Sequence, residues 1–370
     1  MFAIWRSRIL SALIAAAVTG LLALGVNSAF PPRPRFDAGK PEAGITYEVT
    51  GIPSDRIVVS VDGNGAPMEL LTYWAGTYAS YINDYLGIDV EENWDTEFEG
   101  MTLEQTVREE ALTMLRQELV LENACARCGV TLSEEDEKAL AAQRAQYVDS
   151  LGGEEAYRAE LYKLGITPEG YDRLSRTDFL YSALYRYFCD PGSQIYADDA
   201  LLARYAADNG WITADHILFA TQDPATGEER GEEEKAEKKR LAEETLRQLR
   251  DSADPAALFA ELADRYSEDP GRAANPRGYT FTYGTMVEPF DEAARALGEN
   301  EISDIVESSY GYHIILRRPL DEQQAAESVR ADYFDTHLLA DPGDAAEVDP
   351  VVDAFDIRAV WKALREAQSQ

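Results

Sequence analysis

Two short apolar runs, each containing a histidine, place the strongest limit on how this chain folds. The first holds His216 beside Ile217–Phe219, and the second holds His313 beside Ile314–Leu316. Short apolar runs of this length, with turn residues nearby, are typical of buried strands. Each histidine is therefore predicted to lie in or beside a buried strand.

The residues between these two strands predict helices. Apolar side chains recur at i, i+3, i+4 and i+7 in two sets: Phe259, Leu262, Ala263 and Tyr266, and then Phe290, Ala293, Ala294 and Leu297. Each set forms one apolar face of a helix, and Gly298 is a natural stop for the second helix. Strands and helices mixed in this order predict a small α+β domain with helices packed on a sheet.

Three strings in this region carry a family resemblance. They are FAELADRYSEDPG at 259–271, GTMVEPF at 284–290 and YGYHIIL at 310–316. In this order they resemble the parvulin family of peptidyl-prolyl cis/trans isomerases, over residues 209–320. The resemblance implies a four-stranded antiparallel sheet with helices. It also implies an enzyme that isomerises X–Pro peptide bonds and needs no cofactor.

The resemblance implies three catalytic residues. His216 and His313 match the paired histidines of the family, whose rings hydrogen-bond and fix each other's tautomers. Asp269 matches a position near the substrate carbonyl, where a polar or electrostatic role is expected. Each residue also has a plain structural interpretation. Strand histidines are commonly core residues, and Asp269 precedes Pro-Gly, where its role could be that of a turn former alone.

The resemblance also implies a binding slot for the proline ring. Met286 and Phe290 match the slot positions, and their spacing would place both on one face of a helix, although both would also suit a core. The other substrate-binding candidates are Phe281, Tyr279 and Ser309, with Ser308 beside the second histidine.

The stretch Asn275–Phe281 departs from the family pattern. Relatives usually have a Gly-Gly-Asp-Leu-Gly-type segment there, and the leucine that would wall the slot is missing from this chain. Tyr279 is the candidate to replace it, with a shift of one residue. The departure concerns the site of catalysis and not the elements that define the fold.

Residues 1–30 are predicted to form a signal anchor, that is, a single transmembrane helix. Arg6 and Arg8 precede an uncharged run that is long enough to span a bilayer. Arginines on this flank place the N-terminal end in the cytoplasm and the bulk of the chain outside the cell membrane. A cleaved signal peptide is the alternative, although Asn27 fits a cut after Ala29 poorly. The proline-rich residues 31–56 are predicted to be an extended linker.

Residues 57–208 predict a mostly helical domain. A strand at Ile57–Val61 opens it, and signals for the start of a helix follow at Thr102, Ser133 and Thr167. This block resembles the chaperone region of extracytoplasmic foldases of the PrsA and SurA type. The resemblance implies that residues 321–370 return to complete this domain, with the isomerase region as an insert.

Two groups of residues in this block have alternative interpretations. An aromatic stripe at helical spacing is favoured as core packing, with a groove for unfolded chain as the alternative. The cysteines are too few for a zinc site and their C-x-x-C ends a predicted helix, so they are interpreted as buried or idle thiols, with a disulfide as the alternative that an external location would permit. The aromatic stripe comprises Trp74, Tyr78, Tyr81 and Tyr85, and the cysteines are Cys125, Cys128 and Cys189.

The formal net charge of −34 excludes the basic footprint that nucleic-acid binding needs. We therefore predict an extracytoplasmic foldase that binds unfolded exported polypeptides, attaches to the membrane through its N-terminal helix and isomerises X–Pro bonds. The alternatives are a binding chaperone with a weakly active or inactive parvulin domain, and an envelope scaffold. The oligomeric state stays open, with a dimer as one option.

Overall fold

The computed structural model describes residues 44–98, 100–223, 226–320 and 322–369, which divide into two compact units. One unit comprises residues 197–333; because it contains the predicted isomerase region, it is called the isomerase unit below. The helical unit comprises the described residues up to 196 together with 334–369. The predicted signal anchor at 1–30 lies outside the described residues. Across the described ranges, no helix combines the length and hydropathy needed to cross a membrane.

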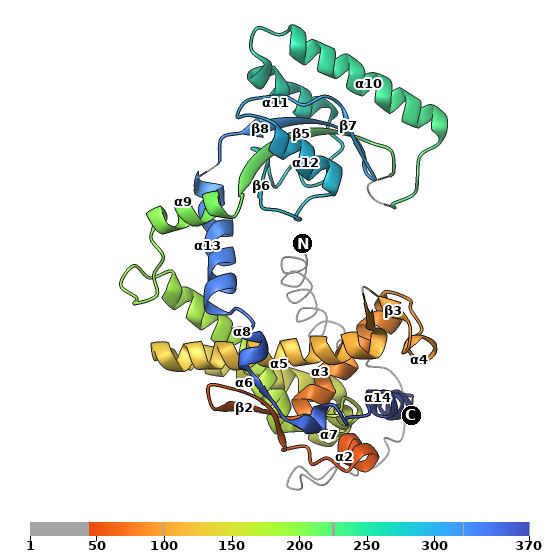
Figure 1. Ribbon diagram of the computed structural model, residues 1–370, viewed down its shortest axis with the longest axis vertical. Helices are drawn as coiled ribbons and strands as arrows, with labels where there is room; N and C mark the ends of the chain where they lie inside the picture. The colour runs from red at the N-terminus through yellow and green to blue at the C-terminus, as the bar shows by residue number, and fades with distance from the viewer. Residues whose placement is uncertain (1–43, 99, 224–225, 321, 370) are drawn as a thin grey trace. The chain divides into compact units, whose positions relative to one another are not determined.

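The isomerase unit is built on a four-stranded antiparallel sheet in the order β6-β5-β8-β7 (Figure 1). Its central strands pair so that His216 faces Ile315 and Leu218 faces His313 across the ladder. The strands are β5 Ile212–Ala220, β6 Tyr279–Phe281, β7 Val306–Ser308 and β8 Gly311–Arg318. The sheet and its helices confirm the predicted α+β parvulin-like fold of this region.

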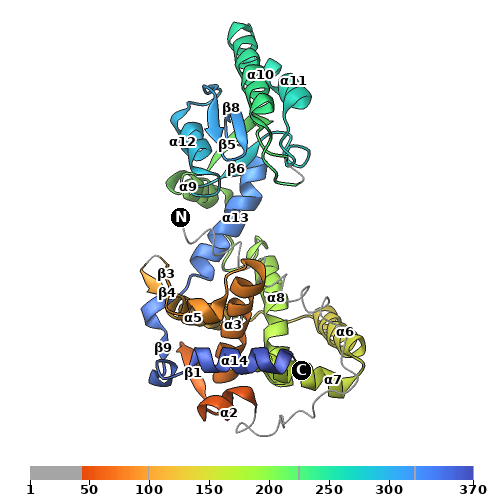
Figure 2. The same ribbon diagram turned by 90° about the vertical axis from the view of Figure 1, so that its right-hand side faces the viewer.

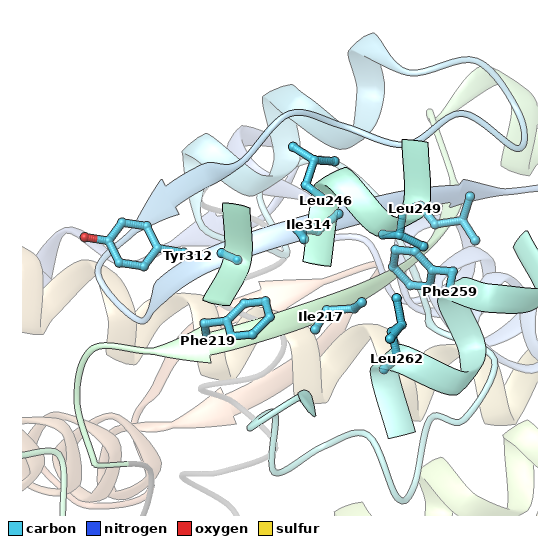
Figure 3. Close-up of a cluster of buried hydrophobic side chains, with 11 residues drawn as sticks. Ile217, Phe219, Leu246, Leu249, Phe259, Leu262, Tyr312 and Ile314 are labelled. Carbon is cyan, nitrogen blue, oxygen red and sulfur yellow. The ribbon is translucent and has the colours of Figure 1, made fainter. Parts of the chain in front are cut away.

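Helices cover both faces of this sheet. The helices of the unit are α9 Asp199–Asp208, α10 Glu232–Asp251, α11 Pro255–Tyr266 and α12 Glu288–Ala296. On one face, Leu246 and Phe259 pack against Ile217 and Ile314 (Figure 3). On the other face, α12 packs Phe290 and Ala294 against Ala214 and Ile315. Because side chains alternate along a strand, both histidines fall on the face that α12 covers.

The helical unit contains long helices and a small sheet in the order β2-β1-β9. Its helices are α2 Ile45–Thr50, α3 Met68–Ser80, the π-helix η1 Tyr81–Tyr85, α4 Val90–Asn93, α5 Leu103–Cys128, α6 Glu134–Leu151, α7 Glu154–Lys163, α8 Pro168–Phe188 and α14 Ile357–Gln368. Short 3-10 turns lie at Gly343–Ala345 and Pro350–Val352, and α13 Glu322–Leu338 runs from the first unit into the second. The strands are β1 Ile57–Val61, β2 Asn64–Pro67 and β9 Glu347–Val348, with a separate hairpin of β3 Glu97–Phe98 and β4 Met101–Thr102.

The predicted helix starts in this unit are confirmed by their caps. Thr102 forms a capping box with Gln105, and Ser133 forms one with Asp136. Thr167 accepts a hydrogen bond from the Gly170 amide, with Pro168 at the first helical position. These side chains satisfy amide groups that a helix leaves unpaired in its first turn.

The C-terminal segment packs within the helical unit. Strand β9 pairs with β1, with Val348 opposite Val59. Helix α14 buries Val360, Trp361 and Leu364 and packs against α3 and α2 (Figure 2). An apolar stripe of this size is stable only when another element covers it.

The prediction of an extended linker at 31–56 is wrong for its last part. Residues Ile45–Thr50 form α2, which packs against α14, and the side chain of Ile45 is buried. Gly51 ends the helix in the left-handed region at φ 70°, which glycine adopts without a steric penalty. The part of this stretch that the structure describes therefore belongs to the helical unit.

The aromatic stripe divides into a buried and an exposed part. Trp74 is buried in α3, whereas Tyr85 is 77 % exposed and stacks on Tyr81 with ring centroids 5.2 Å apart. The core interpretation therefore holds for Trp74 but fails for Tyr85. The three cysteines are free, and burial raises the pKa of the Cys125 thiol to about 11, which makes that thiol unreactive.

A buried carboxyl group in α5 makes the stability of the helical unit depend on pH. Glu118 is 5 % exposed and accepts a hydrogen bond of 2.6 Å from Trp74 Nε1. Burial raises its pKa to about 8, whereas an unfolded glutamate titrates near about 4.3. The folded state therefore holds a proton that the unfolded state releases, and Glu118 destabilises the fold increasingly as the pH rises through this window.

Replacing Glu118 by glutamine is expected to raise the free energy of unfolding by about 1–3 kcal/mol at pH 7.5, because the amide stays neutral and still accepts from Trp74. The gain should fall below about 1 kcal/mol at pH 4.5, where the wild-type carboxyl is protonated in the folded state and about 40 % protonated in the unfolded state. Urea unfolding at the two pH values measures the difference. Glu135→Gln, at an exposed position of α6, is the matched control. An equal gain at both pH values would contradict the assignment.

Candidate active site

The two histidines of the central strands contact each other directly. His216 Nδ1 and His313 Nδ1 lie 3.0 Å apart, and the two rings are nearly parallel, with centroids 5.2 Å apart. Both side chains are largely buried. In the register of β5 and β8 the two histidines are diagonal neighbours on the same face of the sheet, two residues apart along the ladder.

Asp269 contacts this histidine pair from the turn that follows α11. Its Oδ2 lies 3.1 Å from His216 Nε2 and accepts a hydrogen bond of 2.6 Å from the Tyr279 hydroxyl. Its Oδ1 accepts from the Gly271 amide at 3.0 Å. Although burial opposes ionisation, these hydrogen bonds lower the pKa of Asp269 to about 2. The carboxylate is therefore negatively charged at neutral pH.

Ser308 contacts the other end of the histidine pair. Its Oγ lies 2.7 Å from His313 Nε2 and accepts a hydrogen bond from the Tyr310 amide. Burial, together with the neighbouring His216, lowers the pKa of His313 to about 3. The His313 ring is therefore neutral at neutral pH and carries a hydrogen on only one nitrogen.

These contacts select one arrangement of hydrogens when both rings are neutral. The Asp269 carboxylate can only accept, so His216 carries its hydrogen on Nε2 and accepts on Nδ1. His313 must then donate from Nδ1 and accept from the Ser308 hydroxyl on Nε2. The result is a directed chain of hydrogen bonds that ends at the carboxylate and fixes both tautomers.

An apolar surface lies against the two histidine rings. Phe290 is buried, and its ring meets His216 and His313 edge to face, with centroids 5.2 and 5.5 Å away. Phe281 lies 6.0 Å from Phe290, and the half-buried Met286 packs on the same cluster. Apolar and charged groups of the site are therefore adjacent.

The prediction that Met286 and Phe290 share a helix face is wrong. Helix α12 begins at Glu288, and Met286 lies in the bend before it. Pro289 explains the start, because proline fits only the first turn of a helix. The two side chains still pack in one cluster, although the backbone that carries Met286 is not helical.

Two further candidates, Ser309 and Tyr279, do not make the contacts that the family pattern implies. Ser308 makes the contact with His313, whereas Ser309 is exposed and its backbone carbonyl accepts from Gln222. Tyr279 was the candidate to replace a missing leucine wall. Its ring lies 5.8 Å from His216, and its hydroxyl donates to Asp269, so it is also a polar member of the site.

A buried ionic group beside the site was not predicted from the sequence. Asp215 is 1 % exposed and accepts from Arg272 at 3.0 Å and from Arg318 at 3.1 Å. Arg272 belongs to the same turn as Asp269, so its bond to β5 ties that turn to the sheet. The available signal was an aspartate in a mostly apolar strand, because buried charges are nearly always paired.

The tight turn between β7 and β8 depends on a glycine. Gly311 has φ 143°, and a Cβ atom there would lie 2.2 Å from the Phe219 carbonyl oxygen. A larger residue would push the β8 strand away from β5 and disturb the approach of His313 to His216. In the described part of the chain, no group of three or more His, Cys, Asp or Glu side chains could hold a metal ion.

The fold and the site define a parvulin-type domain, and comparison with known families confirms this prediction. Residues 216–318 match the family Rotamase, described as the PPIC-type PPIASE domain. This segment contains all the predicted catalytic and substrate-binding residues.

Among known proteins, the chain is similar to foldases named PrsA. It is 38 % identical to Foldase protein PrsA 1 of Bacillus cereus over 92 residues, which are 24 % of this chain and 32 % of that protein. It is 27 % identical to Foldase protein PrsA of Staphylococcus aureus over 194 residues, 52 % of this chain and 55 % of that protein. The chain thus matches between a third and about half of the length of these relatives. The crystal structure of PrsA from Bacillus subtilis aligns with 86 % of this chain and 93 % of its own, at 20 % identity and a TM-score of 0.25.

Proposed function

We propose that this protein is an extracytoplasmic foldase that binds unfolded exported polypeptides and isomerises their X–Pro peptide bonds. The observation that carries the proposal is the unbroken network from Ser308 through the two histidines to Asp269, which packs against Phe290 inside a PPIC-type domain. His216, His313 and Asp269 are proposed as the catalytic residues.

The chemistry follows from the electronic structure of the amide. Resonance holds the peptide bond planar against a barrier of about 18–20 kcal/mol. In the twisted transition state resonance is lost, so the carbonyl becomes less polar and the nitrogen more basic. A site that disfavours the polar, planar carbonyl and holds the proline ring in an apolar slot lowers this barrier.

Each part of the site has a role in this scheme. We assign the proline ring to the apolar side chains of Met286 and Phe290, with Phe281 next to Phe290 and Tyr279 at the polar edge. The negative Asp269 lies near the substrate carbonyl and disfavours its planar, more polar form. The histidine pair holds Asp269 and Ser308 in fixed positions through its tautomers. Ser309 lies at the exposed rim and is proposed as an outer substrate contact.

Replacing Phe290 by alanine is expected to lower kcat/KM for an X–Pro tetrapeptide by about tenfold, because the ring that contacts proline and both histidines is lost. Met286→Ala should cause a smaller loss, and Met286→Leu should recover most of it, because leucine has a similar volume. A proline isomerisation assay on the soluble chain measures these rates. Tyr283→Ala, at an exposed position, is the control.

The same assay separates the proposal from its alternatives. A wild-type chain that binds unfolded protein but leaves the isomerisation rate at the uncatalysed value would establish a binding chaperone. Catalysis that survives deletion of residues 211–319 would reject the site. Binding of one partner only would indicate an envelope scaffold.

Attachment to the membrane forms part of the proposal. The uncharged run after Arg6 and Arg8 supports a single-pass anchor at residues 1–30, with the bulk of the chain outside the cell. Protease added to intact cells should digest residues 44–370 if this orientation is right, and protection of that part would contradict it.

A further inference from the structure

A groove of about 670 Å³ lies between α6 and α8 of the helical unit, remote in sequence from the isomerase site. Leu140 and Tyr147 line it from α6, and Tyr171 and Phe179 line it from α8. Volumes of this order hold small ligands or a few side chains of a peptide. Neither the proposed proline slot nor the histidine network uses this surface.

Helix α6 is unusual because nothing in the described part of the chain covers it well. None of its 18 residues is buried, and Leu140 and Tyr147 are both half-exposed where they line the groove. Most helices in proteins are stabilised by packing an apolar face against another element. The apolar side of α6 that lines the groove is therefore available to a partner.

The rings of Tyr147 and Tyr171 form the floor of the groove, and a third tyrosine holds them in place. The Tyr147 and Tyr171 rings lie 5.9 Å apart, and both contact the fully buried Tyr157, at 5.6 and 6.4 Å. The aromatic surface is thus ordered before any partner binds. A surface that is already ordered loses little conformational entropy on binding.

The charges of the groove leave one carboxylate unpaired. Arg176 pairs with Glu137, and Arg144 pairs with Glu154 and Asp172. Asp178 also lines the groove and has no ionic or hydrogen-bonding partner among the described residues. Asp178 is exposed overall, but the groove walls partly desolvate its carboxyl group and raise its pKa. A cation in the groove would relieve this unfavourable environment.

We propose that this groove binds a segment of an unfolded client polypeptide, with a large apolar side chain on the tyrosine floor and a Lys or Arg beside Asp178. The inference rests on the proposed function, because a foldase must hold its client while the isomerase unit acts. An unfolded chain supplies both kinds of side chain close together, which matches the apolar walls and the single free charge.

The test uses the full chain and a fluorescein-labelled, proline-free decapeptide that contains Leu, Phe and one Arg. Asp178→Asn is expected to weaken binding of this peptide about fivefold, because one exposed ion pair is lost. A second peptide with Gln in place of Arg should bind the wild-type and Asp178→Asn proteins equally. Asp149→Asn removes the same charge from the exposed end of α6, outside the groove, and should change neither affinity.

A second variant tests the apolar part of the groove. Phe179→Ser should weaken both peptides about tenfold, since it removes a half-exposed aromatic wall. Unchanged affinity in both Asp178→Asn and Phe179→Ser would overturn the proposal. A dimer of the wild-type chain that these variants dissociate in light scattering would also overturn it, because the groove would then hold a second copy.

Isomerisation of a short X–Pro tetrapeptide distinguishes this inference from the proposed function. Both groove variants should keep the wild-type rate, because the tetrapeptide needs only the isomerase unit. If the wild-type chain is catalytically active but the groove variants bind peptide normally, the groove proposal is rejected and the proposed enzyme is not. A wild-type chain without isomerase activity would reject the proposed enzyme, and groove-dependent peptide binding would then survive as the property of a chaperone.

Discussion

Replacing Asp269 by alanine is expected to lower kcat/KM for X–Pro isomerisation by about 100-fold, the size of effect seen when one electrostatic group is removed from an active site. The variant loses the negative charge near the substrate carbonyl. It also leaves the Tyr279 hydroxyl and His216 Nε2 without their acceptor, so the histidine tautomers are no longer fixed.

The proline isomerisation assay measures this loss, and two further variants sharpen it. Asp269→Asn keeps the shape but not the charge, so it should retain more activity than the alanine variant and much less than the wild type. Asp251→Asn, at an exposed position at the end of α10, should be neutral. Equal rates for Asp269→Ala and the wild type, with folding intact, would exclude an electrostatic role for the carboxylate.

Replacing Asp215 by alanine is expected to destabilise the isomerase unit by about 3–5 kcal/mol, because Arg272 and Arg318 lose a buried partner. The loss should appear as faster hydrogen exchange in β5 and in the turn that carries Asp269. Mass spectrometry of backbone amide exchange measures both. Activity should fall with stability, since Arg272 ties this turn to the sheet.

The matched control for this variant is an exposed ion pair of the same unit. Asp304 pairs with Arg250, and its side chain is 85 % exposed. Asp304→Ala should change the free energy of opening by less than about 1 kcal/mol. If the two substitutions had similar effects, Asp215 would not be the buried anchor that its contacts indicate.

Local sequence patterns predicted most elements of the fold. The runs at Ile217–Phe219 and Ile314–Leu316 form the central strands, and the first helical set lies in α11. Thr102 and Ser133 cap the helices that their neighbours predict. These predictions succeed because hydrophobic periodicity and capping act over a few residues.

Features that depend on tertiary contacts were harder to predict. The helix predicted from the apolar set Phe290–Leu297 extends one residue beyond the end of α12. Leu297 follows the last helical residue and has an extended backbone. Met286 reaches the site from a bend, since Pro289 fixes where the helix begins. Asp215 could be recognised as an anchor only once Arg272 and Arg318, far along the chain, were seen to meet it.

The pairing of β1 with β9 has a consequence for how the protein is made. A ribosome releases Val59 long before Val348, so β1 emerges without one of its two neighbours. The isomerase unit, which comprises residues 197–333, is translated completely during this interval. During synthesis, therefore, the inserted unit is the first to be complete, and the helical unit can complete its fold only after translation of β9 and α14.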